Sequence, residues 1–166
     1  MTVVPEFSRP LPLDRVGPVT FETTVTATAA ECAALALRLG VPDLRSLDCR
    51  FRLRRGDVGR IAAEGELHAR LVRECVVSLE PFDTEQTEVF RIVFVPDGTE
   101  IDDGDPESDD EIPYAGSAID LGETAAEQLA LALDPYPQKP GAALPAEVQE
   151  PLDSPFSALG RARDRS

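Results

Sequence analysis

Apolar and polar side chains alternate along two neighbouring stretches of the chain, residues 47–53 and 61–71. A period of two residues is the pattern of a β-strand that buries one face and exposes the other. Residues 55–59 between them read Arg-Gly-Asp-Val-Gly, and the two glycines and the aspartate favour a tight turn. The pattern therefore predicts an antiparallel hairpin. The side chains expected to face the core are Leu47, Cys49, Phe51, Leu53, Ile61, Ala63, Gly65, Leu67, Ala69 and Leu71.

Three further segments have the composition of strands: residues 19–26, 74–79 and 84–95. The first alternates Val, Phe and Thr with polar residues, and the last places Glu88, Phe90, Ile92 and Phe94 on one face and Val89, Arg91, Val93 and Val95 on the other. Short turns connect the strands that follow residue 47. Together with two helices, these strands predict an α+β fold built on a curved or barrel-like antiparallel sheet of four to six strands.

The first helix is predicted over residues 28–39. Thr28 and Glu31 have the spacing of a capping box, in which each side chain bonds the backbone amide of the other residue. Gly40 and Pro42 follow the last apolar position and end the helix. Its buried stripe is expected to consist of Cys32, Leu35, Ala36 and Leu39.

The second helix is predicted over residues 120–134. Asp120 is expected to cap it, with Glu123 three residues later as its capping-box partner. Pro135 and Pro137 then stop the helix, because proline lacks the amide N–H that a helix needs. The apolar stripe of this helix comprises Leu121, Ala125, Leu129, Ala132 and Leu133.

The 166 residues predict one domain over residues 1–137 and a largely disordered tail over residues 138–166. Residues 1–18 contain four prolines and are expected to be an extended lead-in. Residues 97–111 carry nine acidic side chains and neither Lys nor Arg. Such a segment buries little apolar surface, so we expect it to be a flexible acidic loop within the domain.

The formal net charge is −15, and removing the nine acids of residues 97–111 leaves −6 for the rest of the chain. This overall acidity disfavours non-specific binding to nucleic acid, because a polyanion repels the chain at long range. Residues 38–73 differ, since nine Arg and five acids give them a local charge of +4. A local basic surface is therefore possible on an acidic protein.

Arg50, Arg52 and Arg54 occupy alternate positions of a predicted strand, so they project from one face, roughly 6.5–7 Å apart. This spacing matches that of phosphates along a nucleic-acid strand, and it also suits an acidic protein. Glu64 and Glu66 lie on the facing strand and offer the alternative of a solvent face held by Arg–Glu pairs. Both interpretations remain open from the sequence.

No set of residues has the spacing of a catalytic or metal site. His68 is the only histidine, and Cys32, Cys49 and Cys75 are widely separated, whereas structural zinc takes four ligands. The chain has no Gly-x-Ser-x-Gly and no phosphate-binding glycine loop. We therefore expect a protein that is not an enzyme, with reduced thiols, no cofactor, no bound metal and no small-molecule substrate.

The N-terminus lacks the basic and apolar regions of a secretory signal, and no apolar run approaches the ~20 residues that span a bilayer. The expected location is the cytoplasm, without membrane association.

Two motifs resemble those of a known family. One runs Cys75-Val-Val-Ser-Leu-Glu-Pro81, and the other begins Asp120-Leu-Gly-Glu123 and ends Leu133-Asp-Pro-Tyr-Pro137. With Pro155-Phe-Ser-Ala-Leu159, they are similar to the YceD family of large ribosomal RNA subunit accumulation proteins, in its alphaproteobacterial form. Many members have Cys-x-x-Cys-Leu-x-Pro in the first motif and further cysteines that suggest zinc. Here Ser78 replaces the second Cys, so the resemblance implies no metal site.

The resemblance implies a non-catalytic factor that supports accumulation of large-subunit ribosomal RNA and ribosome assembly. Its expected partners are ribosomal RNA, a basic ribosomal protein or another assembly factor. The alternative is a protein-interaction module with no ribosomal role, which docks through its C-terminal tail.

Both motifs join apolar residues to a rigid proline, so we expect residues 79–81 to pack near helix 120–134. Leu79 and Leu129 would then lie in the core, and nearby polar residues would form a shared rim. The alternative is that these residues only stabilise the fold and bind no partner. With the three arginines, the candidate binding residues are Glu80, Pro81, Glu127, Asp134 and Tyr136.

Overall fold

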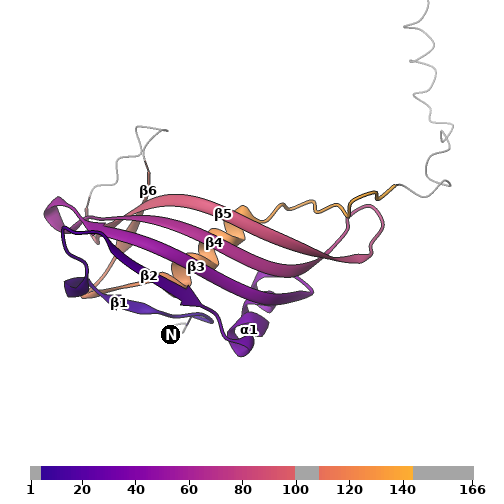
Figure 1. Cartoon of the computed structure of the whole chain (residues 1–166), viewed down its shortest axis with the longest axis horizontal. Coiled ribbons are helices and arrows are strands. Elements are labelled where there is room, and N and C mark those ends of the chain that lie inside the picture. The colour runs from indigo at the N-terminus through magenta and orange to yellow at the C-terminus, as the bar shows by residue number, and fades with distance from the viewer. Residues whose placement is uncertain (1–4, 100–108, 144–166) are drawn as a thin grey trace, which may run out of the picture.

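The computed structural model describes residues 5–99 and 109–143, in which five strands form one open sheet. Two helices and a two-stranded ribbon pack on one face of this sheet (Figure 1). The sheet order is β2 (Phe21–Thr26), β3 (Asp43–Arg55), β4 (Ile61–Glu74), β5 (Pro81–Pro96) and β6 (Asp110–Tyr114). The ribbon pairs β1 (Pro10–Pro12) with β7 (Ala118–Asp120), the helices are α1 (Ala29–Leu39) and α2 (Leu121–Ala132), and two 3-10 turns are η1 (Leu13–Arg15) and η2 (Asp57–Gly59).

The predicted α+β class and both helices are confirmed, and the sheet is curved but not closed into a barrel. Strands β3 and β4 form the predicted hairpin, and all ten residues expected to face the core are buried. Gly65 is explained by its neighbour in β5, because a Cβ at this position would lie 2.1 Å from the ring of Phe90. A glycine in the middle of the strand thus makes room for an aromatic ring.

The strand predicted over residues 74–79 does not exist. Strand β4 continues to Glu74, which is paired with Pro81 at the start of β5, so the residues between them must form a turn. Leu79 has a φ of 58°, a left-handed conformation that no strand contains. The apolar residues of this segment are therefore turn residues, and Leu79 is 69% exposed.

Strand β6 was not predicted, and it pairs with β5 in parallel, whereas the pattern indicated antiparallel neighbours only. A parallel neighbour requires a connection of a dozen or more residues, which residues 97–109 provide. Of the acidic segment 97–111, residues 100–108 lie outside the described residues. Asp110 and Glu111 belong to β6, so the segment ends in a strand and not in a loop.

The two helices begin differently from each other. In α1, the capping box between Thr28 and Glu31 is present as predicted, and Gly40 closes the helix in a left-handed conformation. In α2, the Asp120 carboxylate accepts the N–H groups of Gly122 and Glu123. The carboxylate of Glu123 does not return to the cap, which corrects the predicted box.

Glu123 instead bonds Arg38 of α1 through two contacts of 2.7 and 2.9 Å, and this ion pair joins the two helices.

The N-terminal segment is part of the core rather than a lead-in alone, since Phe7, Leu11 and Val16 are all buried. It crosses the first turn of α2 so closely that a Cβ on Gly122 would lie 2.6 Å from the carbonyl oxygen of Phe7. The register of β1 with β7 places Leu11 opposite Ile119. Backbone proximity therefore explains why this turn of the helix contains glycine.

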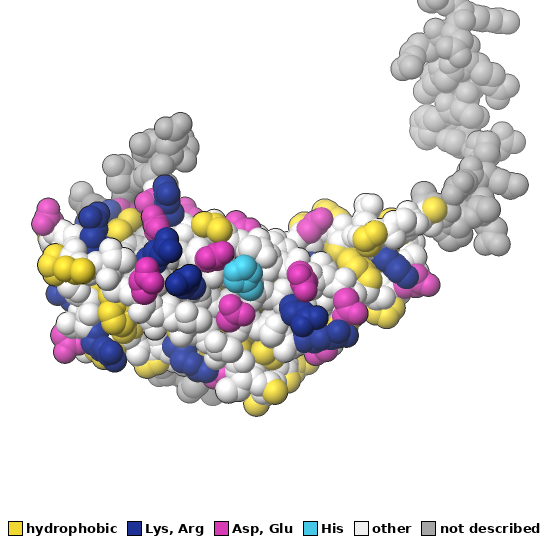
Figure 2. All heavy atoms as spheres, viewed as in Figure 1, with side chains coloured by type: hydrophobic (Ala, Val, Ile, Leu, Met, Phe, Trp, Pro, Cys, Tyr) yellow, Lys and Arg dark blue, Asp and Glu magenta, His cyan; other side chains and the backbone are white. Residues whose placement is uncertain are grey.

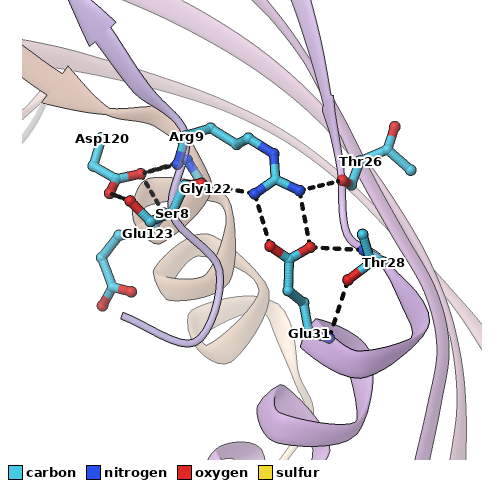
Figure 3. A network of polar contacts seen from close by, with 8 residues as sticks. All are labelled: Ser8, Arg9, Thr26, Thr28, Glu31, Asp120, Gly122 and Glu123. Carbon is cyan, nitrogen blue, oxygen red and sulfur yellow. Dashed lines mark hydrogen bonds and ion pairs between the residues drawn. The ribbon is translucent and has the colours of Figure 1, made fainter. Parts of the chain in front are cut away.

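A cluster of polar side chains, which we call the clasp, ties this segment to both helices; it consists of Ser8, Arg9, Glu31 and Asp120 (Figure 3). The Arg9 guanidinium donates to both oxygens of Glu31 at 2.7 and 2.8 Å and to the carbonyl of Thr26 at 3.0 Å. The Asp120 carboxylate accepts the N–H of Arg9 at 2.7 Å and the Ser8 hydroxyl. The contacts within the clasp thus serve to hold the fold together.

Candidate functional site

The face of the five-stranded sheet opposite the helices is uncovered in the described part of the chain, and charged side chains occupy it (Figure 2). The alternation along β3, β4 and β5 produces this face, because residues between the buried positions point to solvent. We call it the outer face.

Arg50, Arg52 and Arg54 lie side by side on the outer face, as the alternation predicted. Glu66 and Glu64 are directly opposite Arg50 and Arg52 in β4. The ion pairs, however, form toward β2 on the other side: Glu22 lies 3.7 Å from Arg50 and 3.2 Å from Arg52. The expected Arg–Glu pairing is therefore present with a different carboxylate.

Arg54 stands opposite Ala62, and no carboxylate of the described residues lies within 4.0 Å of it. The carboxylates of β4 make other contacts: Glu64 lies 3.6 Å from Arg91, and Glu66 lies 3.5 Å from His68. Two of the three arginines are thus loosely paired and the third is not paired among these residues.

His68 lies on β4, the central strand of the sheet, and is half exposed, as predicted. Its Nδ1 lies 3.4 Å from the Thr87 hydroxyl, and Asp48 stands opposite it in β3. At the far end of this face, Arg45 contacts Asp83 at 2.7 Å and Arg70 contacts Glu85 at 3.4 Å. Pairs of opposite charge therefore run from one end of the face to the other.

Cations and anions are nearly balanced on the outer face. Six arginines and seven carboxylates project from its strands, so the surface has a mixed rather than a basic character. The members are Arg45, Arg50, Arg52, Arg54, Arg70 and Arg91, with Glu22, Asp43, Asp48, Glu64, Glu66, Asp83 and Glu85. Such a surface offers directional ion pairs to another polar surface, but it does not concentrate positive charge as a phosphate-binding site does.

The turn over residues 75–80 is the second candidate region, and it meets the chain that follows α2. The N–H of Val76 donates to the carbonyl of Pro137 at 2.9 Å, and Glu80 pairs with Lys139 at 2.9 Å. Leu129 is buried as predicted, whereas the prediction that Leu79 lies in the core is wrong. The turn therefore packs beside the segment after the helix, and that segment contributes Lys139, which the sequence patterns did not single out.

Cys75 is buried at the centre of this turn, and its sulfur accepts the N–H of Ser78 at 3.4 Å. The pKa of Cys75 is lowered to about 7, chiefly because the Ser78 side chain and the N–H of Lys139 stabilise the thiolate. The other two cysteines behave in the opposite way, since burial raises the pKa of Cys49 to about 12 and also raises the pKa of Cys32. All three cysteines are free thiols.

The remaining predicted site residues lie in separate places. Glu127 is on the exposed side of α2, beside a cavity that Ile112 and Leu131 also line. The carbonyl of Asp134 accepts a bond from Arg73, and its carboxylate accepts the N–H of Tyr136 at 2.8 Å. The contacts that Glu80, Glu127 and Asp134 make do not join them into one rim.

The described residues contain no group of three His, Cys, Asp or Glu side chains placed to hold a metal ion. Among them, no helix has the length and apolar character needed to cross a membrane. The predictions that the protein binds no metal and catalyses no reaction remain predictions.

Comparison with known proteins gives one match. The family described as large ribosomal RNA subunit accumulation protein YceD matches residues 63–159, from β4 through α2 and beyond the described residues. No curated protein and no solved structure matches the chain. The match includes the turn over residues 75–80 and α2, and Arg50, Arg52 and Arg54 lie outside it.

Proposed function

Since the chain belongs to the YceD family of large ribosomal RNA subunit accumulation proteins, we propose that it is a non-catalytic factor acting by binding. In this proposal it supports accumulation of large-subunit ribosomal RNA in the cytoplasm by holding a component of the assembling subunit. The family description specifies this outcome and no chemical reaction. We therefore propose which surface of the protein binds, and which kind of partner it binds, to support accumulation of large-subunit ribosomal RNA.

The observation that supports a binding role is the uncovered outer face. An antiparallel sheet commonly leaves one face in solvent, but here that face carries thirteen charged side chains in loosely formed pairs. Exposed ion pairs contribute little to stability, so they exchange partners at small cost. The outer face is thus suited to a second charged surface that brings complementary groups.

A ribosomal or assembly protein fits this face better than ribosomal RNA does. Binding to RNA gains most of its free energy when cations replace counterions around the phosphates, which requires an excess of positive charge. The six arginines of the outer face are offset by seven carboxylates, and the whole chain carries −15. Ribosomal proteins are cationic, so the overall field attracts them and repels RNA.

The first test is genetic. A strain lacking this protein should accumulate less large-subunit than small-subunit ribosomal RNA, and sedimentation of its ribosomal particles should show a reduced large-subunit peak. The intact gene should restore both. Normal large-subunit levels in the deletion strain would contradict the proposed function.

The second test concerns the surface. The triple variant Glu22→Gln, Glu64→Gln, Glu66→Gln removes three carboxylates from the outer face; it should melt like the parent and bind a cationic ribosomal partner about tenfold more weakly, a loss of roughly 1.4 kcal/mol. The matched variant Arg50→Ala, Arg52→Ala, Arg54→Ala removes positive charge from the same face and should not weaken binding to a cationic protein; a loss in this variant alone, with a marked salt dependence, would indicate RNA. Glu80→Ala with Glu127→Ala serves as the comparison for the second region. If only that pair reduced binding, the outer face would be the wrong surface.

Treatment with ribonuclease distinguishes the partner. Capture of a ribosomal or assembly protein that survives ribonuclease supports the proposal. Capture that ribonuclease abolishes, with a steep salt dependence, would identify RNA as the partner. A single non-ribosomal protein that is lost when the chain is truncated after Lys139 would favour the alternative module that docks through its tail.

A further inference from the structure

A groove of about 420 Å³ lies between α2 and the start of β6. Its apolar lining comes from Ile112 of β6 and from Ala130 and Leu131 of α2. Leu131 is 76% exposed although it sits on a helix whose other face is buried in the core. A large apolar side chain at the wall of a groove is a contact surface for another apolar group.

The edge of the groove is acidic. Asp110 and Glu127 line it, and the only cation among its lining residues is Arg38, which is already bonded to Glu6 and Glu123. Burial, and next the charge of Glu123, raise the pKa of Glu127, and the charge of Arg38 offsets this rise only in part. A ligand that combines apolar side chains with positive charge would complement this groove.

The C-terminal segment of the same chain has this composition. Within residues 155–165, Phe156 and Leu159 are the large apolar residues, and Arg161, Arg163 and Arg165 follow them with a single acid, Asp164. We propose that residues 155–165 dock in the groove between α2 and β6, with Phe156 and Leu159 against Leu131 and the arginines at the acidic edge. The segment over residues 97–111 is a poorer occupant, because it contains nine acids and no Lys or Arg.

The chain is long enough for this contact. Leu131 is twelve residues before Ala143, the last described residue, and Phe156 is thirteen residues after it. Because an extended chain spans at most about 3.3–3.6 Å per residue, the segment after Ala143 can retrace the path back to Leu131. The family match also ends at Leu159, so it includes both apolar residues of the proposed occupant.

This inference does not depend on the proposed function, since the groove and the outer face have no lining residue in common. Here the C-terminal segment binds to the domain of its own chain, whereas in the alternative described above it binds to another protein.

Disulfide trapping in the full-length protein tests the contact. Cys32 and Cys49 are buried and have raised pKa values, and Cys75 is replaced by Ser in every variant because its pKa is lowered. Ala130 is an exposed residue at the edge of the groove. In the variant Ala130→Cys with Ala158→Cys, an intramolecular disulfide should form at least about tenfold faster than in Thr87→Cys with Ala158→Cys. Thr87 is exposed on the outer face, so this control measures random encounter of the same tail. Peptide mass spectrometry after alkylation identifies the linked residues.

A second pair of substitutions tests the chemistry of the contact. Adding Phe156→Ser and Leu159→Ser to the Ala130→Cys variant should slow trapping to the rate of the outer-face control, while the fold of residues 5–143 is untouched. Equal rates in the groove and control variants would overturn the proposal. Disulfides that form only between molecules, at a rate that rises with protein concentration, would also overturn it and would identify a second copy as the occupant.

Discussion

Arg and Glu side chains pair in two regions of this protein, and the two regions use the same chemistry differently. In the clasp, Arg9 bonds both oxygens of Glu31 at 2.7 and 2.8 Å, and the side chains are only 34% and 22% exposed. On the outer face, Arg50 and Arg52 share the carboxylate of Glu22 at 3.7 and 3.2 Å, and all three are about half exposed. Geometry and burial therefore separate a structural ion pair from an adjustable one.

The difference arises from the backbone around each pair. The clasp closes where the N-terminal segment crosses both helices, so its groups are held by neighbours on several sides. The outer face is one layer of side chains on a sheet, and water reaches every pair. We expect substitutions in the clasp to lower stability, and substitutions on the outer face to affect binding.

The largest effect on stability is expected from Gly122→Ala, beneath the clasp. In an ordinary helix this change is favourable, but here the new Cβ would lie 2.6 Å from the carbonyl oxygen of Phe7 and 2.9 Å from the N atom of Arg9. Both are backbone atoms, so the N-terminal segment must move, and the free energy of unfolding should fall by about 1–3 kcal/mol. Urea denaturation of the parent and the variant measures this difference in the free energy of unfolding.

The control is Gly17→Ala, where a Cβ meets no atom within 4 Å. It should leave the free energy of unfolding within about 0.5 kcal/mol of the parent. Equal effects at the two glycines would show that the N-terminal segment is not held over α2.

Glu31→Gln should lower the free energy of unfolding by about 1–2 kcal/mol at pH 7, because it breaks the ion pair with Arg9 and weakens the cap on Thr28. The bond from Arg9, and next that from the N–H of Thr28, lower the pKa of Glu31 to about 2. Since Glu31 is 22% exposed, solvent screening reduces the effect below what the full pKa shift would give.

The pH dependence of this variant has a definite sign. A carboxylate whose folded-state pKa is depressed stabilises the fold above its usual pKa of about 4.5, and the stabilisation is lost as the pH falls through about 2. The difference in free energy of unfolding between the parent and Glu31→Gln should thus be full at pH 7 and should decrease between pH 4.5 and pH 2. A difference that stays constant down to pH 2 would contradict this account.

Glu22→Gln makes the same chemical change on the outer face and should lower the free energy of unfolding by less than about 0.5 kcal/mol. The partners of Glu22 are half exposed, so water replaces the lost contacts. A loss as large as that of Glu31→Gln, in parallel urea titrations, would remove the distinction between the two regions.

Cys75 provides the last test, with an effect on reactivity and none on stability. Cys75 is buried, so a reagent reaches it only when the turn over residues 75–80 opens. Because its pKa is lowered to about 7 and that of Cys49 is raised to about 12, alkylation of the native protein at pH 8 should still modify Cys75 first. Its rate should rise roughly tenfold between pH 6 and pH 8 as the thiolate forms. Preferential modification of Cys32 or Cys49, by mass spectrometry, would contradict this assignment.

Local patterns were sufficient for the elements whose partners are neighbours in the chain. The alternation over residues 47–71 predicted the β3–β4 hairpin and its core residues from Leu47 to Leu71, and Thr28 with Glu31 predicted the cap of α1. The outward position of Arg50, Arg52 and Arg54 followed from the same alternation. In each of these cases the backbone period alone decides where a side chain points.

Contacts between distant segments were decided only by the tertiary structure. Glu123 has the spacing of a cap partner, yet it bonds Arg38 because packing brings α1 beside the first turn of α2. Glu22, rather than the predicted Glu64 and Glu66, pairs with the arginines because β2 is their other neighbour. Leu79 is exposed because β4 and β5 pair up to Glu74 and Pro81, which forces the residues between them into a turn. Pairing over such separations depends on which strands and helices meet in space, and no local period in the sequence records that.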